Sequence, residues 1–135
     1  MDYWRAAVQN TLNHPGLGSG PGTFQRPYAR LKAPESEMAR LAHNDYLEQF
    51  SDSGMVGGIA YLAWIFLILR AIARSAWKSD EPLLFSVFVG LLGWFAQAFS
   101  EFSLFVPALA WPAFALAGCA LRLAANQIDK PPRAS

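Results

Sequence analysis

The sequence predicts an all-α membrane protein, in which three transmembrane helices are preceded by a loop segment with two short helices. The 135 residues are 53% hydrophobic and 14% aromatic, and the mean hydropathy is +0.19. The apolar residues are concentrated between Met55 and Leu123, where charges occur only in short breaks. Residues 1–53, in contrast, are polar and rich in Gly and Pro. This uneven distribution is typical of a membrane protein with one segment in water.

The length fits a single domain, for which we expect three parts. Residues 1–54 form an extracytoplasmic loop segment, residues 55–123 form the transmembrane helices, and residues 124–135 form a cytoplasmic tail. The formal net charge is only +1, so the chain has no bulk attraction to nucleic acid, and we expect no such partner.

The loop segment begins with a predicted helix over residues 2–13. Trp4, Val8 and Leu12 recur every four residues and form an apolar stripe along it. Pro15 ends the helix, because proline disfavours helical backbone at the residue before it. His14 is therefore expected to be a helix-stop residue rather than a second base.

Alternating glycines follow over residues 16–22 and allow tight turns and close approach of the backbone to another surface or a ligand. A plain turn is the expected meaning of this segment. No strand precedes these glycines and no Gly-Lys-Ser/Thr follows, so they form neither a dinucleotide-binding fingerprint nor a P-loop. Residues 25–37 carry a cluster of charges typical of a solvated loop.

A second helix is predicted over residues 38–53, ended by Gly54 at its C′ position. His43, Leu47 and Phe50 share one face of this helix, which we expect to turn toward the membrane. This spacing alone indicates a hydrogen-bonded core histidine. A polar face lies elsewhere on the helix, formed by Asn44, Glu48 and Asp52.

Three apolar runs are long enough to be transmembrane helices, over about residues 55–73, 83–99 and 104–123. Each approaches the roughly 20 residues that cross about 30 Å of hydrocarbon at 1.5 Å per residue. The single cysteine, Cys119, lies in the third run, where it has no partner for a disulfide or a metal site. We expect it to pack between helices.

The basic residues near the membrane predict the orientation. The side reached after the first and third runs carries six of them, Arg70, Arg74, Lys78, Arg122, Lys130 and Arg133. Within about 20 residues of the first run, the opposite side has only Arg40. The positive-inside rule therefore places residues 1–53 and Glu101 outside the cytoplasm. No signal peptide precedes this polar segment, so we expect the chain to be the C-terminal part of a longer protein.

Three stretches together resemble the C-terminal signature of the O-antigen ligase and O-antigen polymerase family. They are Tyr3-Trp4-Arg5 leading into the glycine segment from His14 to Phe24, then Ala42-His43-Asn44-Asp45-Tyr46-Leu47-Glu48 with Gly54-Met55-Val56-Gly57, and finally Phe102-Ser103-Leu104-Phe105-Val106-Pro107-Ala108. Their order and spacing match over nearly the whole chain. In two places the sequence departs from the family: the chain starts after the arginine that usually precedes Tyr3, and Glu101 stands where aspartate is common.

The resemblance implies a multi-pass protein of the bacterial inner membrane that takes part in polysaccharide and lipopolysaccharide synthesis for the cell envelope. Such enzymes transfer glycan from an undecaprenyl diphosphate carrier to lipid A core, to another glycan or to protein. The implied partners are the carrier-linked glycan, the lipid A core or glycan acceptor, and membrane lipid. The motifs do not separate ligase, polymerase and protein glycosylation.

Transfer from a lipid diphosphate requires a base for the acceptor hydroxyl and positive charge for the departing diphosphate. The resemblance places His43 at the loop histidine of the family, as the candidate base. Arginines bind phosphate oxygens bidentately, and the candidates are Arg26, Arg30, Arg40 and Arg5. Two interpretations of Glu101 stay open: it is an exposed acid of the turn, or it pairs with a loop arginine and holds the loop against the helices. We expect no metal and no other cofactor, because no His, Cys and carboxylate set has metal-ligand spacing.

Two other functions stay open. The chain is a non-catalytic remnant of a truncated membrane protein, or it is a small membrane subunit or transporter piece without sugar chemistry. The combination of motifs favours the transferase over the subunit. The DNA upstream of Met1 separates the transferase from the remnant, because an in-frame continuation with more apolar spans supports the former and a stop codon supports the latter.

Overall fold

The computed structural model describes residues 2–78 and 81–128, and this part of the chain is all-helical, as predicted. Two of the basic residues used for the orientation, Lys130 and Arg133, lie outside the described residues, as does most of the expected cytoplasmic tail. The elements in order are α1 (Asp2–Asn13), α2 (Gln25–Leu31), α3 (Asp45–Lys78), α4 (Pro82–Gln97), the 3-10 turn η1 (Ser103–Phe105) and α5 (Pro107–Ile128).

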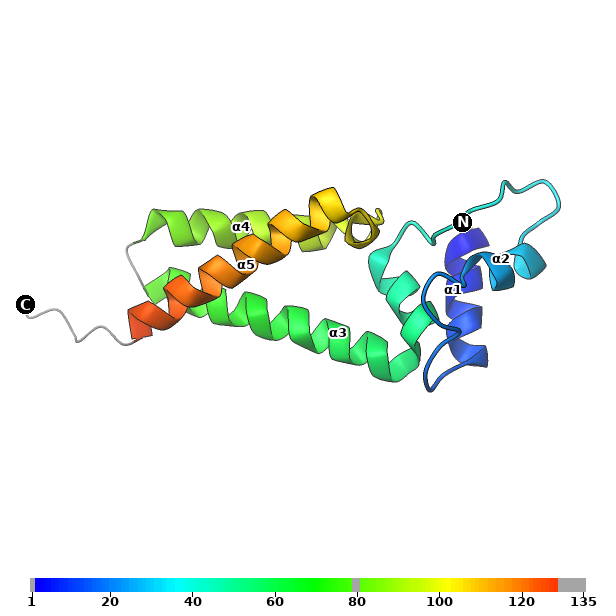
Figure 1. Cartoon of the computed structure of the whole chain (residues 1–135), viewed down its shortest axis with the longest axis horizontal. Helices are drawn as coiled ribbons and strands as arrows, with labels where there is room; N and C mark the ends of the chain where they lie inside the picture. The colour runs from blue at the N-terminus through cyan, green and yellow to red at the C-terminus, as the bar shows by residue number, and fades with distance from the viewer. Residues whose placement is uncertain (1, 79–80, 129–135) are drawn as a thin grey trace, which may run out of the picture.

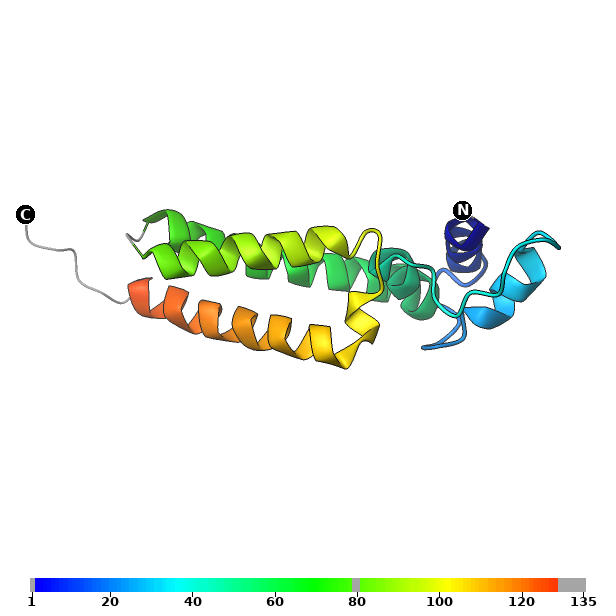
Figure 2. The same cartoon turned by 90° about the horizontal axis from the view of Figure 1, so that it is seen from above.

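The three long helices lie side by side, and the N-terminal helices gather at one end of them (Figure 1). There α1 runs across the direction of α3, as the end-on appearance of α1 in Figure 2 also shows. The last turns of α3 and α5 both lie at the opposite end (Figure 1).

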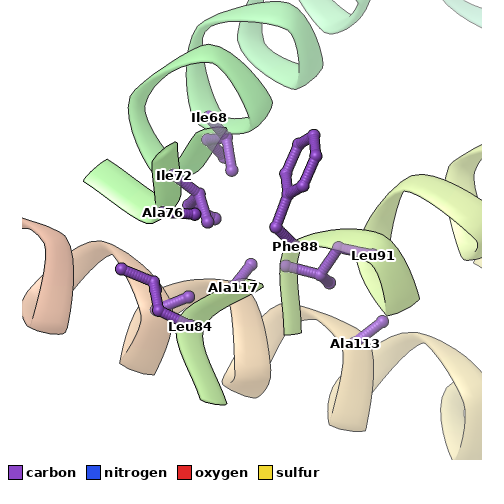
Figure 3. Close-up of a cluster of buried hydrophobic side chains, with 9 residues drawn as sticks. Ile68, Ile72, Ala76, Leu84, Phe88, Leu91, Ala113 and Ala117 are labelled. Atoms are coloured by element: carbon purple, nitrogen blue, oxygen red, sulfur yellow. The ribbon is translucent and has the colours of Figure 1, made fainter. Parts of the chain in front are cut away.

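Buried apolar side chains from α3, α4 and α5 form a common core (Figure 3). Its members are Ile68, Ile72, Ala76, Leu84, Phe88, Leu91, Ala113, Ala117 and Ala120. On α5 the inward face is made of alanines at three- and four-residue spacing, which lets the backbones of neighbouring helices approach closely.

Two helices are long and apolar enough to cross a membrane. They are α3, with a mean hydropathy of 2.0 over its most apolar window, and Pro107–Asn126 of α5, with 1.5. Only 22% and 28% of these windows are buried, so most of their apolar surface faces outward, unlike that of a core helix in a soluble protein.

The predicted second span, residues 83–99, is the 16-residue helix α4. At 1.5 Å per residue this helix covers about 24 Å, less than a straight crossing of about 30 Å requires. The length criterion thus supports two spans where three were predicted. The predicted run extended to Phe99 because Ala98 and Phe99 are apolar, but both residues belong to the turn after α4.

A kink at Gly54 divides α3 into two helical segments. The backbone there has φ 68° and ψ −170°, which is non-helical and lies in the region that favours glycine. A Cβ at Gly54 would collide with the backbone of Gly16 and Gly18. The backbone N–H of Met55 donates to the carbonyl of Pro15 at 2.8 Å. Gly54 therefore ends the first segment as predicted, while a second helix begins immediately after it.

Two local predictions in the loop segment were wrong. The helix expected over residues 38–53 begins only at Asp45, because Asn44 caps it by accepting a hydrogen bond from the backbone N–H of Leu47 at 3.0 Å. Residues 25–31, expected to be loop, form α2. There Phe24 and Tyr28 are buried and stack at 5.6 Å between ring centroids, which stabilises the helical turn.

Candidate functional site

Hydrogen bonds fasten α1 and the glycine segment to the first turns of α3. The Asn10 side chain is buried and donates to the hydroxyls of Ser19 and Ser51, both at 2.8 Å. The backbone N–H of Gly20 donates to the carbonyl of Asp52 at 3.0 Å. The close approach requires glycine at Gly18, where a Cβ would collide with the backbone of Asp52 and Gly54.

Three buried carboxylates in the first segment of α3 form hydrogen bonds to three other segments of the chain. They belong to Asp45, Glu48 and Asp52. Each is at most 4% exposed and accepts a hydrogen bond from a backbone N–H. In that order the donors are Leu104 at 2.9 Å, Ala42 at 2.6 Å and Gly22 at 3.1 Å. Glu48 and Asp52 lie on the polar face that their helical spacing predicted, but this spacing gave no sign that the face is buried.

Burial raises the pKa of all three carboxyl groups. It raises the pKa of Asp45 to about 6 and that of Glu48 to about 7, although the hydrogen bonds from Leu104 and Ala42 oppose the shift. The pKa of Asp52 is also raised by burial. One oxygen of each carboxyl has no hydrogen-bond partner among the described residues. Protonation of Glu48 near neutral pH therefore removes a charge whose burial costs free energy.

His43 lies in the turn before α3, and its side chain is exposed. It is not on a helical face with Leu47 and Phe50, so that prediction was wrong. Its backbone has φ 49°, which is uncommon outside glycine, although histidine adopts this conformation more often than most residues. Its ring contacts Tyr3 of α1 at 5.5 Å and Phe102 of the turn before η1 at 5.0 Å, between ring centroids. His43 therefore stands where the loop segment meets the long helices.

A cavity of about 300 Å³ opens beside His43. Its other lining residues are Asp2, Tyr3, Tyr28, Ser36, Glu37, Met38 and Ala39. Two hydrogen bonds fix its wall: the Ser36 hydroxyl donates to Asp2 Oδ2 at 2.5 Å, and the Tyr28 hydroxyl donates to the carbonyl of Glu37 at 2.9 Å. The cavity thus joins the start of α1 to the segment that leads into α3.

The four candidate arginines are all exposed, and none of them lines this cavity. Arg26 and Arg30 lie on α2, and Arg40 lies three residues before His43. Arg5 lies on α1 and borders a separate, mostly apolar groove with Trp4, Val8 and Leu12. None of the four arginines therefore shares the cavity with His43.

Other residues than Glu101 fasten the loop segment to the long helices. Glu101 is exposed in the turn between α4 and η1. The Tyr46 hydroxyl donates to the carbonyl of Phe95 at 2.6 Å, and the backbone N–H of Asp45 donates to the carbonyl of Ala98 at 2.9 Å. Asp45 and Tyr46 belong to the second motif of the sequence, but nothing in that motif predicted their contacts with α4 and the turn after it.

No set of three or more His, Cys, Asp or Glu side chains within residues 2–78 and 81–128 is placed to hold a metal ion. Comparison of the chain with family models, with curated proteins and with solved structures gives no match. The functional proposal therefore depends on the site itself and on the resemblance of its motifs.

Proposed function

We propose that this chain is the C-terminal part of a membrane glycan transferase of the O-antigen ligase and polymerase type. The supporting observation is the position of His43. It is an exposed imidazole with a left-handed backbone, at the junction of the loop segment and the apolar helices and beside a cavity. Residues in sparsely populated backbone conformations are concentrated at functional sites.

In this proposal α3 from Met55 onward, α4 and α5 all cross the bacterial inner membrane. Although α4 is short, it packs against both neighbours and shares their core. A short apolar helix is accommodated by local thinning of the bilayer. Arg70, Arg74 and Lys78 near the end of α3 and Arg122 on α5 are exposed. These ends share one side of the molecule (Figure 1), which we assign to the cytoplasm.

The chemistry then takes place on the extracytoplasmic side. Neutral His43 accepts the proton of an acceptor hydroxyl as that oxygen bonds to the anomeric carbon of the glycan. The bond from that carbon to the diphosphate oxygen breaks, and undecaprenyl diphosphate leaves. Its lipid tail stays in the bilayer, so the diphosphate lies at the membrane boundary, near the turn that holds Phe102. Arg40 is the first arginine candidate for this charge because it is nearest to His43 along the chain.

The transfer reaction itself tests this proposal. The chain is expressed in frame with the coding sequence upstream of Met1 and reconstituted in liposomes with undecaprenyl diphosphate-linked glycan and lipid A core. We expect glycan to move to the acceptor, with undecaprenyl diphosphate released in equal amount. A folded protein that transfers nothing from this carrier, to lipid A core or to a second glycan, would contradict the proposal. A stop codon directly upstream would instead favour the non-catalytic remnant.

A further inference from the structure

The cavity beside His43 combines aromatic rings with oxygen acceptors. Tyr3 supplies ring surface, and Met38, Ala39 and the buried Tyr28 add to the wall. Between them lie the carboxyl groups of Asp2 and Glu37 and the hydroxyl of Ser36. A sugar ring needs this combination, because its C–H faces pack on aromatic rings while its hydroxyls donate hydrogen bonds to carboxylates.

The charge of the lining restricts which ligands fit. Among residues 2–78 and 81–128, both charged side chains that line it, Asp2 and Glu37, are acidic, and no lysine or arginine of this part of the chain lines it. The hydrogen bond from Ser36 lowers the pKa of Asp2, so Asp2 is ionised at neutral pH. Arg5 lies near Asp2 but does not line the cavity. A phosphate or a uronate in this cavity would meet like charge, which disfavours its binding.

The position of the cavity distinguishes two sides of His43. Tyr3 both lines the cavity and contacts the histidine ring, whereas Phe102 contacts the ring but does not line the cavity. Phe102 belongs to the turn that joins α4 to α5, at the end of the apolar helices. A ligand in the cavity therefore approaches His43 from the side of α1.

We propose that this cavity binds one sugar ring of the acceptor, selects against negative charge on that ring, and presents its hydroxyl to His43. The volume of about 300 Å³ lies at the lower end of the range for ligand pockets, so it suits one ring rather than a chain. Assigning the ring to the acceptor depends on the proposed function. Binding of the ring itself does not, and it is measured separately.

Saturation-transfer NMR on the chain in lipid nanodiscs, which avoid detergents with sugar head groups, tests the binding. The probes are methyl glycosides of a neutral hexose, an amino hexose and a uronic acid. We expect a saturation-transfer signal, and thus binding, from the neutral hexose and the amino hexose, and little signal from the uronic acid. Tyr3→Leu should weaken binding of the neutral glycoside roughly three- to tenfold, the range of aromatic pair contributions, and Tyr3→Phe should keep it. Equal binding by wild type and Tyr3→Leu would overturn the site.

A second pair of variants tests the selection by charge. The double variant Asp2→Asn with Glu37→Gln should admit the uronate. Glu35→Gln, which removes an exposed charge two residues away without touching the cavity, should not. Uronate binding that matches neutral-sugar binding in the wild type would overturn the selection. If sugars fail to bind while the liposome assay still shows transfer, this inference fails and the proposed function stands. If sugars bind but the liposome assay shows no glycan transfer, this inference stands and the proposed function fails.

Discussion

His43 is held in place by its two neighbours in the sequence. The backbone N–H of Ala42 donates to buried Glu48, and Asn44 caps α3. Because both flanking residues are fastened to α3, the backbone turns sharply between them and the imidazole projects outward. Glu48 is thus a positioning residue for His43 in the proposed reaction, and its protonation affects the stability of the fold.

Replacing Glu48 by Gln should flatten the dependence of stability on pH. The pKa of Glu48 is about 7 in the folded protein and ordinarily 4.5, so the folded state binds more protons between these values. Its contribution to stability is fully present below pH 4.5 and is lost as the pH rises through 7. Thermal melts in nanodiscs between pH 6.5 and 8 should show the Tm of the wild type falling and that of Glu48→Gln changing much less.

The exposed Glu35 provides the control for this measurement, since Glu35→Gln should keep the slope of the wild type. Asp45, with a pKa raised to about 6, titrates mainly below this window. An unchanged slope in Glu48→Gln would show that Glu48 is not the group responsible.

At the scale of elements, the junction between the glycine segment and the kink of α3 holds the two parts of the molecule together. Gly18 and Gly54 both have positive φ, and their backbones approach so closely that neither position has space for a Cβ. Conformation and space together require glycine at both positions.

Replacing Gly54 by Ala should therefore lower the free energy of unfolding. The left-handed backbone costs roughly 1–3 kcal/mol for a residue with a Cβ, and displacement of the glycine segment adds to it. Gly118→Ala is the matched control, because its Cβ would meet nothing and alanine favours helix. Unfolding followed by circular dichroism compares the two, and equal stability of Gly54→Ala and wild type would refute the close docking.

The elements differed in how well the sequence predicted them. The bounds of α1 were predicted correctly, because the stop at His14-Pro15 is a local signal. The start of α3 was placed too early, since helical periodicity continues across residues 38–44 while the cap at Asn44 depends on a single side-chain bond. α2 was missed because its stability comes from buried Phe24 and Tyr28, whose burial requires contacts distant in sequence.

The whole molecule presents apolar side chains outward along α3, α4 and α5. Examples are Leu67 at 61% exposed and Trp111 at 76%. Hydropathy therefore predicted the long apolar helices but placed their ends poorly, since the turn from Ala98 to Val106 also contains apolar residues. Hydropathy also gave no sign of the cavity, whose lining comes from α1, α2 and the segment before α3.

The proposed orientation is tested by reporters fused after Ser135. A cytoplasm-active fluorescent protein should be active there, and a periplasm-active phosphatase should be inactive, because the basic residues near the membrane gather on that side. Moving the phosphatase into the exposed turn at Glu101 should restore its activity. The opposite pattern would reverse the assignment of the loop segment.

The most direct test of the central claim is turnover per folded molecule after His43→Ala, in the chain extended upstream of Met1. Because general-base catalysis contributes about 10²–10⁴-fold, we expect a loss of roughly that size, with membrane insertion and carrier binding retained. His14→Ala, at an exposed position that does not line the cavity, should have a far smaller effect. If His43→Ala lowers only the amount of folded protein and each folded molecule still transfers glycan at the normal rate, His43 is not the base.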